Sequence, residues 1–385
     1  MKTLKAFTLG IICNFAFFAS AQLPVAGNYH GLFAESSGIT HQSGGFIKVT
    51  VNSLGAFSGY LLLDGNKLAF SGKGFPTNVV ISSRTNKFGK EPLTVSLAAQ
   101  LPLETEQIIG TVTSSSWTAE ISADRAVWST LNPTTNNLAR YTFVLPGSVE
   151  PELAPAGDGV GWGVNNSGGF ATWGGYLADR TPIAQKASIS AWNRIPVYIP
   201  AYRSFTTYSN GFTHSTAFKS EHLGSLMGWV AITVGNDRPL AGTLTWTKTA
   251  SGSLNKCSAL VTNYYPQGFT METSLIGSYY DSLGIGQWPL IMDAGVLTMQ
   301  GGNLIDPLEN LFTITNTTVS RVRFDAPNSI NQTLTFTAGT GRITSAFIHP
   351  DTGLRSLIYG VALQEQNICR GSFLGTNQSG SFLLE

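Results

Sequence analysis

The stretch 93–101 reads Leu-Thr-Val-Ser-Leu-Ala-Ala-Gln-Leu, and its strict alternation decides the fold class of the chain. Apolar side chains occupy every second position, so one face of the segment is apolar and the other is small or polar. A β-strand places successive side chains on opposite faces of a sheet, whereas a helix repeats about every 3.6 residues. The stretch therefore predicts a half-buried β-strand.

The same alternation continues along the rest of the chain. Residues 117–124 and 243–247 alternate in this way, while no long segment after residue 21 has the apolar spacing of an amphipathic helix. Turns with glycine separate the segments, and four glycines are expected in left-handed backbone or in close backbone approaches: Gly55, Gly65, Gly168 and Gly353. Many short strands between such turns predict an all-β protein of tandem antiparallel β-meander units that form barrels or sandwiches.

The composition excludes several classes of protein. Of the 385 residues, 42% are hydrophobic and 12% are charged. A disordered chain needs low hydrophobicity and high charge, and a coiled coil needs many Glu and Lys residues. The formal net charge of +1 provides no basic field for nucleic acid. We therefore expect a globular β-protein without a nucleic-acid partner.

The first 21 residues have the pattern of a secretory signal peptide. Lys2 and Lys5 precede an apolar stretch that ends near Phe18, and residues 19–21 (Ala-Ser-Ala) supply the small residues of a cleavage site. The apolar stretch is short for a membrane-spanning helix. We expect cleavage after Ala21 and a mature chain that is secreted, periplasmic or at the cell surface.

A proline-rich segment from Leu145 to Asp158 predicts the main linker, because closely spaced prolines cannot serve central strands. A softer boundary is expected near residues 281–289. The chain then divides into a signal peptide (1–21) and β-domains at 22–147, 148–282 and 283–385, and the sequence leaves open whether the last two share one core. Residues 49–59, 162–172 and 334–344 are similar strand–turn–strand segments, which predicts an internal repeat.

Short phrases of glycine, aromatic residues and turns carry a family resemblance. Residues 264–269 (Tyr-Tyr-Pro-Gln-Gly-Phe), 196–202 (Pro-Val-Tyr-Ile-Pro-Ala-Tyr) and 373–380 (Phe-Leu-Gly-Thr-Asn-Gln-Ser-Gly) resemble a secreted bacterial β-rich repeat family. In that family such a region is often the tail of a large surface protein with immunoglobulin-like domains. The resemblance implies a β-rich, surface-exposed protein, and it assigns no activity to any residue.

The sequence contains no compact motif for catalysis, metal binding or cofactor binding. The five histidines are not spaced as a metal pair, and the Gly-x-Ser-x-Gly and phosphate-loop motifs are absent. We therefore predict no catalytic residue, no metal and no cofactor. The two cysteines after residue 21, Cys257 and Cys369, are predicted to lie close enough for a disulfide, and two free buried thiols are the alternative.

Aromatic residues are the best candidates for a binding surface. The expected middle unit is rich in tryptophan and tyrosine, and exposed rings of these types suit sugar stacking or a protein interface. The candidate binding residues are Trp162, Trp173, Trp192, Tyr198 and Trp229. The alternative is that these rings fill a core.

These observations favour a non-catalytic secreted or cell-surface protein with a structural, adhesive or ligand-binding role. A polysaccharide or a surface protein is the expected partner. An outer-membrane β-barrel is the second interpretation, because the alternation, the low charge and the signal peptide also fit one. A secreted glycoside hydrolase is the third, because β-architectures can carry a pair of catalytic carboxylates.

Overall fold

The computed structural model describes residues 23–82, 90–100, 106–135, 138–209, 216–233, 239–250, 263–284, 287–314, 321–324 and 333–385, without the side chains of 205–209, 216–221, 321–323 and 333. The named elements in these ranges are β-strands, which confirms the all-β prediction. They form three antiparallel eight-stranded sheets, each from one continuous part of the chain. We call these parts the first, second and third units. No helix in the described ranges is long and apolar enough to cross a membrane.

The first unit pairs its strands in the order β4-β3-β2-β1-β8-β7-β6-β5. Its strands are β1 (Gly27–Ala34), β2 (Gly45–Val51), β3 (Ala56–Leu63), β4 (Asn66–Lys73), β5 (Thr77–Ile81), β6 (Leu93–Ala99), β7 (Gln107–Thr113) and β8 (Thr118–Ala126). The alternation that opened the sequence analysis is seen in β6, where Leu93, Val95 and Leu97 are buried. The first and last strands pair, with Asn28 opposite Ala126.

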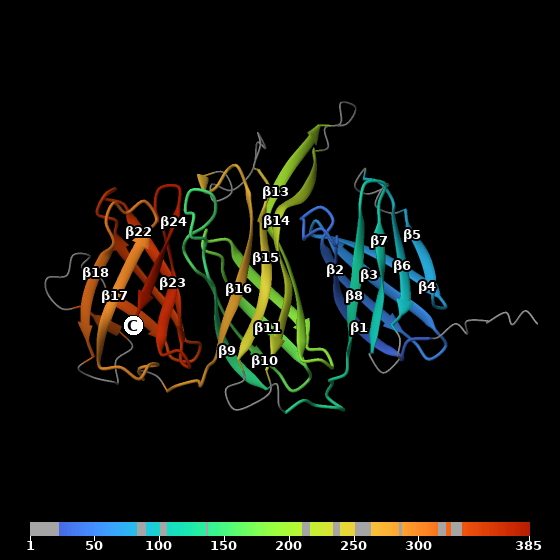
Figure 1. Cartoon of the computed structure of the whole chain (residues 1–385), viewed down its shortest axis with the longest axis horizontal. Helices are drawn as coiled ribbons and strands as arrows, with labels where there is room; N and C mark the ends of the chain where they lie inside the picture. The colour runs from blue at the N-terminus through green and yellow to red at the C-terminus, as the bar shows by residue number, and fades with distance from the viewer. Residues whose placement is uncertain are drawn as a thin grey trace, which may run out of the picture.

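The second unit repeats this strand order as β12-β11-β10-β9-β16-β15-β14-β13. Its strands are β9 (Ala139–Leu145), β10 (Gly159–Asn165), β11 (Phe170–Tyr176), β12 (Pro182–Ser188), β13 (Arg194–Ser209), β14 (Thr216–Ile232), β15 (Leu240–Lys248) and β16 (Phe269–Tyr279). The long strands β13 and β14 form a hairpin that projects beyond the row of units (Figure 1).

The third unit pairs its strands in the order β18-β17-β24-β23-β22-β21-β20-β19. Its strands are β17 (Ala294–Gly301), β18 (Leu308–Thr313), β19 (Arg321–Arg323), β20 (Thr333–Thr337), β21 (Arg342–Ile348), β22 (Arg355–Leu363), β23 (Ile368–Leu374) and β24 (Ser379–Leu384). Again the first and last strands pair, with Leu297 opposite Leu384.

The sheets curl, and specific contacts bring some edge strands together. The Gln185 amide on β12 donates to the Pro196 carbonyl oxygen and accepts from the Tyr198 backbone N–H, each at 2.9 Å, and so bridges β12 to β13. In the third unit an isolated bridge between Phe312 and Phe324 joins β18 to the end of β19. The described chain forms two nearly closed barrels and a half-barrel.

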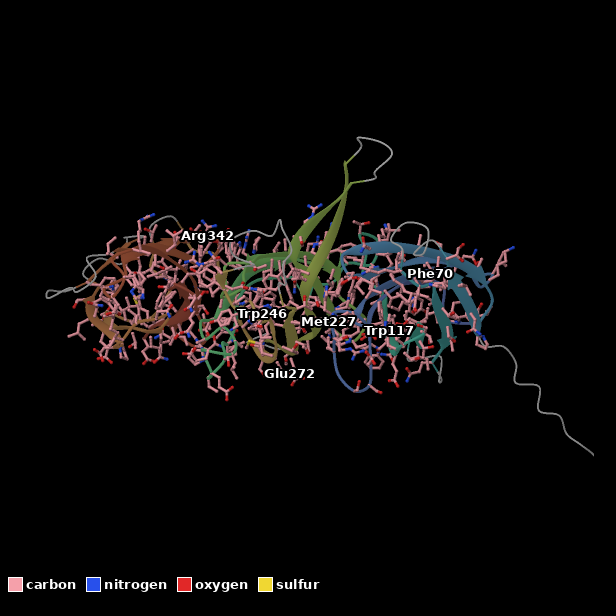
Figure 2. All side chains as sticks on the ribbon, turned by 90° about the horizontal axis from the view of Figure 1, so that it is seen from above. Phe70, Trp117, Met227, Trp246, Glu272 and Arg342 are labelled. Atoms are coloured by element: carbon pink, nitrogen blue, oxygen red, sulfur yellow. The ribbon has the colours of Figure 1, made fainter. Side chains whose placement is uncertain are left out.

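Each unit encloses its own apolar core, and the three units lie in a row (Figure 1). Figure 2 shows the row from above, with Trp246 inside the second unit and Met227 on the side of that unit nearest the first. Burial of these apolar inner faces is the main favourable contribution to folding. The first unit packs on the second, and the second packs on the third.

The strand pairing places the first domain boundary before the predicted position at residue 147. Strand β9 pairs with β10 and β16, so it belongs to the second unit. The proline-rich segment is therefore the connection from β9 to β10 inside that unit. Prolines mark a break in a strand, and they do not tell whether the break lies between units or within one. At its end, Gly157 packs so closely on the third unit that a Cβ would lie 2.5 Å from the Gly380 carbonyl oxygen.

Three of the four predicted turn glycines have left-handed backbone, and one does not. The φ angles of Gly55, Gly65 and Gly353 are 73°, 70° and 67°. The prediction for Gly168 is wrong, because in this turn its neighbour Gly169 has the positive φ, 75°. Gly169 also lies against Trp128, where a Cβ would be 2.3 Å from the Trp128 Cβ. In a Gly-Gly turn the sequence does not show which glycine needs the special conformation.

Candidate functional site

The second unit packs against the first mainly through β13, which contacts β1 and β2. Tyr198 and Met227 of the second unit are buried against Leu32 of the first. Beside them Arg194 forms a bidentate ion pair with the fully buried Asp124, with Nε–Oδ2 at 3.0 Å and Nη2–Oδ1 at 2.8 Å. We call this contact the first junction. It combines apolar burial with a neutralised charge pair.

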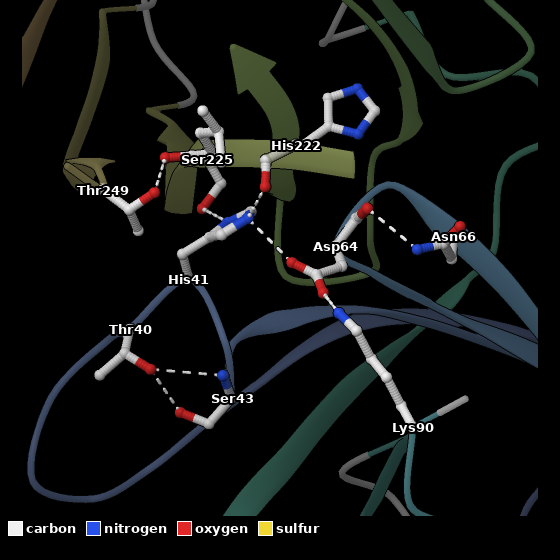
Figure 3. A network of polar contacts seen from close by, with 10 residues as sticks. Thr40, His41, Ser43, Asp64, Asn66, Lys90, His222, Ser225 and Thr249 are labelled. Atoms are coloured by element: carbon white, nitrogen blue, oxygen red, sulfur yellow. Dashed lines mark hydrogen bonds and ion pairs between the residues drawn. The ribbon is translucent and has the colours of Figure 1, made fainter. Parts of the chain in front are cut away.

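A polar network extends the first junction (Figure 3). The His41 Nε2–H donates to the His222 carbonyl oxygen at 2.7 Å and to Asp64 Oδ1 at 2.9 Å, and His41 Nδ1 lies 3.4 Å from Ser225 Oγ. Lys90 donates to the other Asp64 oxygen. Burial alone would raise the pKa of Asp64, but the hydrogen bonds from His41 and Lys90 hold that pKa at about 2. Asp64 is therefore an ionised acceptor within the contact between the units.

A second histidine on the same junction is held in its neutral form. His30 on β1 contacts the Ser188 hydroxyl of the second unit through Nδ1. Burial, and then the positive charge of Lys48, lower the pKa of His30 to about 4. Burial also lowers the pKa of His222. Protonation of these rings therefore works against the first junction.

The contact between the second and third units, which we call the second junction, also combines an apolar cluster with an ion pair. Its fully buried aliphatic side chains are Val144, Val160, Val361 and Leu363. Arg370 donates to both oxygens of Asp158, with Nε–Oδ2 at 2.8 Å and Nη2–Oδ1 at 2.9 Å. Burial raises the pKa of Asp158 more than the positive charge and hydrogen bond of Arg370 lower it.

The five predicted binding rings do not form one surface. Trp173 is buried in the core of the second unit. Tyr198 and Trp229 belong to the first junction and Trp162 to the second. Trp192 is the exposed member of the set, with 53% of its surface accessible. The aromatic richness of the middle unit is thus explained largely by packing within the unit and against both neighbours.

The second junction opens into a cleft of about 470 Å³, which we call the tyrosine–arginine cleft. Its lining residues are Tyr176, Arg180 and Tyr264 of the second unit, and His349, Thr352, Leu354, Arg355, Ser356, Leu357, Tyr359, Leu374, Gly375 and Thr376 of the third. The volume falls in the range of small-ligand sites. Two arginines and no acidic residue occur among these lining residues.

A strained turn between β11 and β12 positions Arg180 in this cleft. The Arg180 N–H donates to the Leu177 carbonyl oxygen at 2.9 Å, and Arg180 has a left-handed φ of 69°. Asp179 Oδ1 accepts from the Thr181 N–H at 3.0 Å and tightens the turn. Left-handed backbone costs a residue other than glycine about 1 kcal/mol or more, and such strain is often found at functional positions.

The Arg180 side chain is held by aromatic rings and a carbonyl group. Its guanidinium carbon lies 4.1 Å from the centroid of the Tyr359 ring, and Tyr359 stacks on Tyr176 at 4.6 Å between centroids. One Nη donates to the Leu357 carbonyl oxygen, and the buried Nε has no hydrogen-bond partner. No acidic side chain in the described parts of the chain pairs with Arg180. Burial lowers the pKa of Arg180 to about 10, and the neighbouring tyrosines, Tyr359 first, oppose this shift only in part.

A buried polar chain supports the second-unit wall of the cleft. The Tyr202 hydroxyl donates to Asp179 Oδ2 at 2.6 Å and accepts from Trp246 Nε1 at 2.8 Å. The buried Lys248 donates to the Tyr264 carbonyl oxygen. Burial raises the pKa of Asp179. Although Asp179 is next to Arg180 in the sequence, its carboxyl group accepts the hydrogen bond of Tyr202 and does not pair with Arg180. Asp179 therefore fixes the turn and leaves the Arg180 charge uncompensated.

The remaining predicted site residues give no second candidate. Cys369 is a free cysteine buried in the core of the third unit, and Cys257 lies outside the described residues, so the predicted disulfide has no support here. Among the described residues no group of His, Cys, Asp and Glu side chains is arranged to hold a metal ion.

Comparisons with known proteins add little to this picture. No family model and no curated protein sequence matches the chain. A solved structure of intact Ap-TbpB, with its N and C lobes, aligns with 94% of this chain and 77% of its own, at 9% sequence identity and a TM-score of 0.20. A TM-score this low does not establish a common fold.

Proposed function

We propose that the protein is an exported, non-catalytic binding protein whose ligand occupies the tyrosine–arginine cleft. The observation that carries the proposal is Arg180, a largely buried guanidinium that lines an open cleft and pairs with no carboxylate in the described chain. A charge removed from water without a partner is costly. A ligand that completes its contacts is a physical reason for keeping such a group.

The cleft is preformed, which favours binding. Its two walls belong to different units, but the Arg370–Asp158 pair and the aliphatic cluster hold those units together. The Tyr264 hydroxyl also donates across the junction to the Gly375 carbonyl oxygen at 2.8 Å. A site that is already ordered loses less conformational entropy when its ligand binds.

The expected location and the absence of catalysis are parts of the same proposal. The signal-peptide pattern and the family resemblance support export to the cell surface, where a polysaccharide or a surface protein is available as ligand. Two carboxylates that could have served a hydrolase, Asp124 and Asp158, each accept both hydrogen bonds of a bidentate arginine. Such pairing suits the junctions and leaves these carboxylates poorly placed for acid–base chemistry.

The test is to fill the cleft. Thr376 is exposed on its rim, so Thr376→Trp should occupy the site with little effect on the core. Ser58→Trp, on the exposed face of β3 in the first unit, is the matched control. Soluble polysaccharides and acidic and neutral peptides are then screened by calorimetry against the wild-type protein and both variants.

We expect at least one ligand to bind the wild-type protein and Ser58→Trp, to bind Thr376→Trp at least about tenfold more weakly, and to be recovered unchanged. Binding that is equally strong in Thr376→Trp would contradict the cleft as the site. Hydrolysis of a bound polysaccharide would contradict the non-catalytic role.

A further inference from the structure

The charges of the tyrosine–arginine cleft specify its ligand further. Three partly buried arginines pair with a carboxylate, and two of them, Arg194 and Arg370, form bidentate pairs. Arg125 pairs with Glu106 at 2.6 Å. Arg180 has instead a tyrosine face and a carbonyl oxygen, and both are neutral. Arg180 thus lines the cleft without an anion from the described chain. Arg342 also has no acidic partner there, but it lies over the Trp162 ring and does not line the cleft.

The rest of the cleft strengthens the positive field. Arg355 is exposed on the third-unit wall of the same cleft, opposite Ile348 in the sheet. With no acidic lining residue, two positive charges face one concave space. Low-dielectric walls focus such a field and raise the local concentration of anions.

The shape of the cleft favours a segment of a polymer over the surface of a folded protein. Folded partners usually bury about 800 Å² on each side of a flat interface. The present site is a concavity of about 470 Å³ walled by Tyr176, Tyr264 and Tyr359. Tyrosine combines an apolar ring with a polar tip, which suits sugar rings that carry hydroxyl groups on apolar carbons.

We propose that the tyrosine–arginine cleft binds an anionic polysaccharide, with a carboxylate or sulfate group of the polymer placed between Arg180 and Arg355. This inference rests on the proposed function and names its ligand class. Guanidinium groups bind both anions through paired hydrogen bonds. The sugar ring next to the anionic group lies against the tyrosine wall.

The test compares matched ligands on the wild-type protein. Polygalacturonate supplies carboxylates, its fully methyl-esterified form has the same sugar chain without charge, and heparin supplies sulfates. Poly-glutamate supplies carboxylates on a peptide. We expect polygalacturonate or heparin to bind at least about tenfold more tightly than the methyl ester. Binding of one and not the other identifies the anion as carboxylate or sulfate.

Variants connect this preference to Arg180. Arg180→Gln should weaken binding of the anionic polysaccharide about tenfold to a hundredfold and reduce its salt dependence, whereas Lys73→Gln, an equal charge change at an exposed residue of β4, should not. Arg180→Lys keeps the charge without the planar fork and should weaken binding by an intermediate amount.

Three results separate the possible failures. Equal binding of polygalacturonate and its methyl ester, still sensitive to Thr376→Trp, overturns the anionic ligand and leaves the proposed function intact. Binding of poly-glutamate alone, lost in Arg180→Gln, replaces the polysaccharide with an acidic peptide. If no ligand is sensitive to Thr376→Trp, the proposed function itself fails.

Discussion

The two junctions share their main parts and differ in how an arginine over an aromatic ring is used. Each has a buried apolar cluster and a bidentate arginine–aspartate pair, Arg194–Asp124 at the first and Arg370–Asp158 at the second. Each also has an arginine over an aromatic ring, with Arg194 4.6 Å from Trp229 and Arg180 4.1 Å from Tyr359. At the first junction the arginine over the ring is also the arginine of the ion pair. At the second junction these are two different arginines.

Because of this difference, the first junction only holds two units together, whereas the second also leaves the charge of one arginine without a carboxylate partner. Arg194 serves the packing of units, because its charge is neutralised by a carboxylate that is itself buried. Arg180 adds charge at a junction that already has its ion pair, and its position opens into a cleft. The comparison therefore predicts that the two arginines respond in opposite ways to substitution.

The largest expected difference is between Arg194→Met and Arg180→Met. Methionine keeps much of the side-chain length and removes the charge. In Arg194→Met the buried Asp124 loses its positive partner and keeps the hydrogen bond from the Gln107 amide, so we expect a loss of about 3–5 kcal/mol in the free energy of unfolding. In Arg180→Met no carboxylate is left unpaired, so we expect a change within about 1 kcal/mol of zero. Urea denaturation measures both values, and equal destabilisation would remove the distinction between the junctions.

Mild acid should weaken the first junction before the second. The folded-state pKa of His30 is about 4, below the unfolded value of 6.5, so the unfolded state binds the proton first as the pH falls. Stability is therefore unaffected above about pH 7 and decreases from pH 6.5 to pH 4, by on the order of 2–3 kcal/mol. The lowered pKa of His222 acts in the same direction, and Asp64 adds a further loss as the pH falls from about 4 towards 2.

At the second junction, the effect of acid on stability through Asp158 has the opposite sign. Its folded-state pKa is raised, so its unfavourable burial is relieved as the pH falls through that pKa. Hydrogen exchange at pH 6.5 and pH 4.5, corrected for the intrinsic rate, should show faster relative exchange in β1 and little change in β22. In His30→Gln this difference should shrink, and its persistence would show that another group controls the first junction.

The smallest expected effect distinguishes two turn glycines. Gly65 and Gly353 both have positive φ, so an alanine at either position costs about 1 kcal/mol in backbone strain. At Gly65 the new Cβ would also lie 2.1 Å from Nδ1 of His222 across the first junction, while at Gly353 nothing lies within 4 Å. Gly65→Ala should therefore lower the melting temperature more than Gly353→Ala and should also speed exchange in β1. Equal shifts would mean that His222 moves aside without cost.

The sequence predicted the local structure of the strands better than the contacts between units. Alternation within one segment is enough to predict β6 and the buried face of Leu93, Val95 and Leu97, because that pattern depends only on neighbours in the chain. For the aromatic residues of the middle unit the sequence left open a binding surface or a core, and the structure buries Trp173 while Trp192 is exposed. Whether Tyr198 or Trp162 faces solvent or another unit depends on how complete sheets pack together, which no local pattern contains.

The tyrosine–arginine cleft was missed for the same reason. Arg180 and Tyr359 are far apart in the sequence, and their contact exists only after two units have folded and docked. One local signal was present: an Asp-Arg-Thr-Pro turn at 179–182 between two strand-like segments. It predicts a turn with an exposed arginine, but it does not reveal that Tyr359 of the third unit packs against that arginine.

The pairing of the first and last strands in every unit has a mechanical consequence. In each unit the start of the first strand lies beside the end of the last, as Asn28 opposite Ala126 and Leu297 opposite Leu384 show. The two strands are antiparallel, so a pull on the two ends of a unit acts on the hydrogen bonds between its first and last strands one after another, starting at the ends. The row therefore resists tension through its junctions more than through its sheets. Under tension, a unit released from its neighbour would unfold at low force and extend the chain, while the docked units keep their shape.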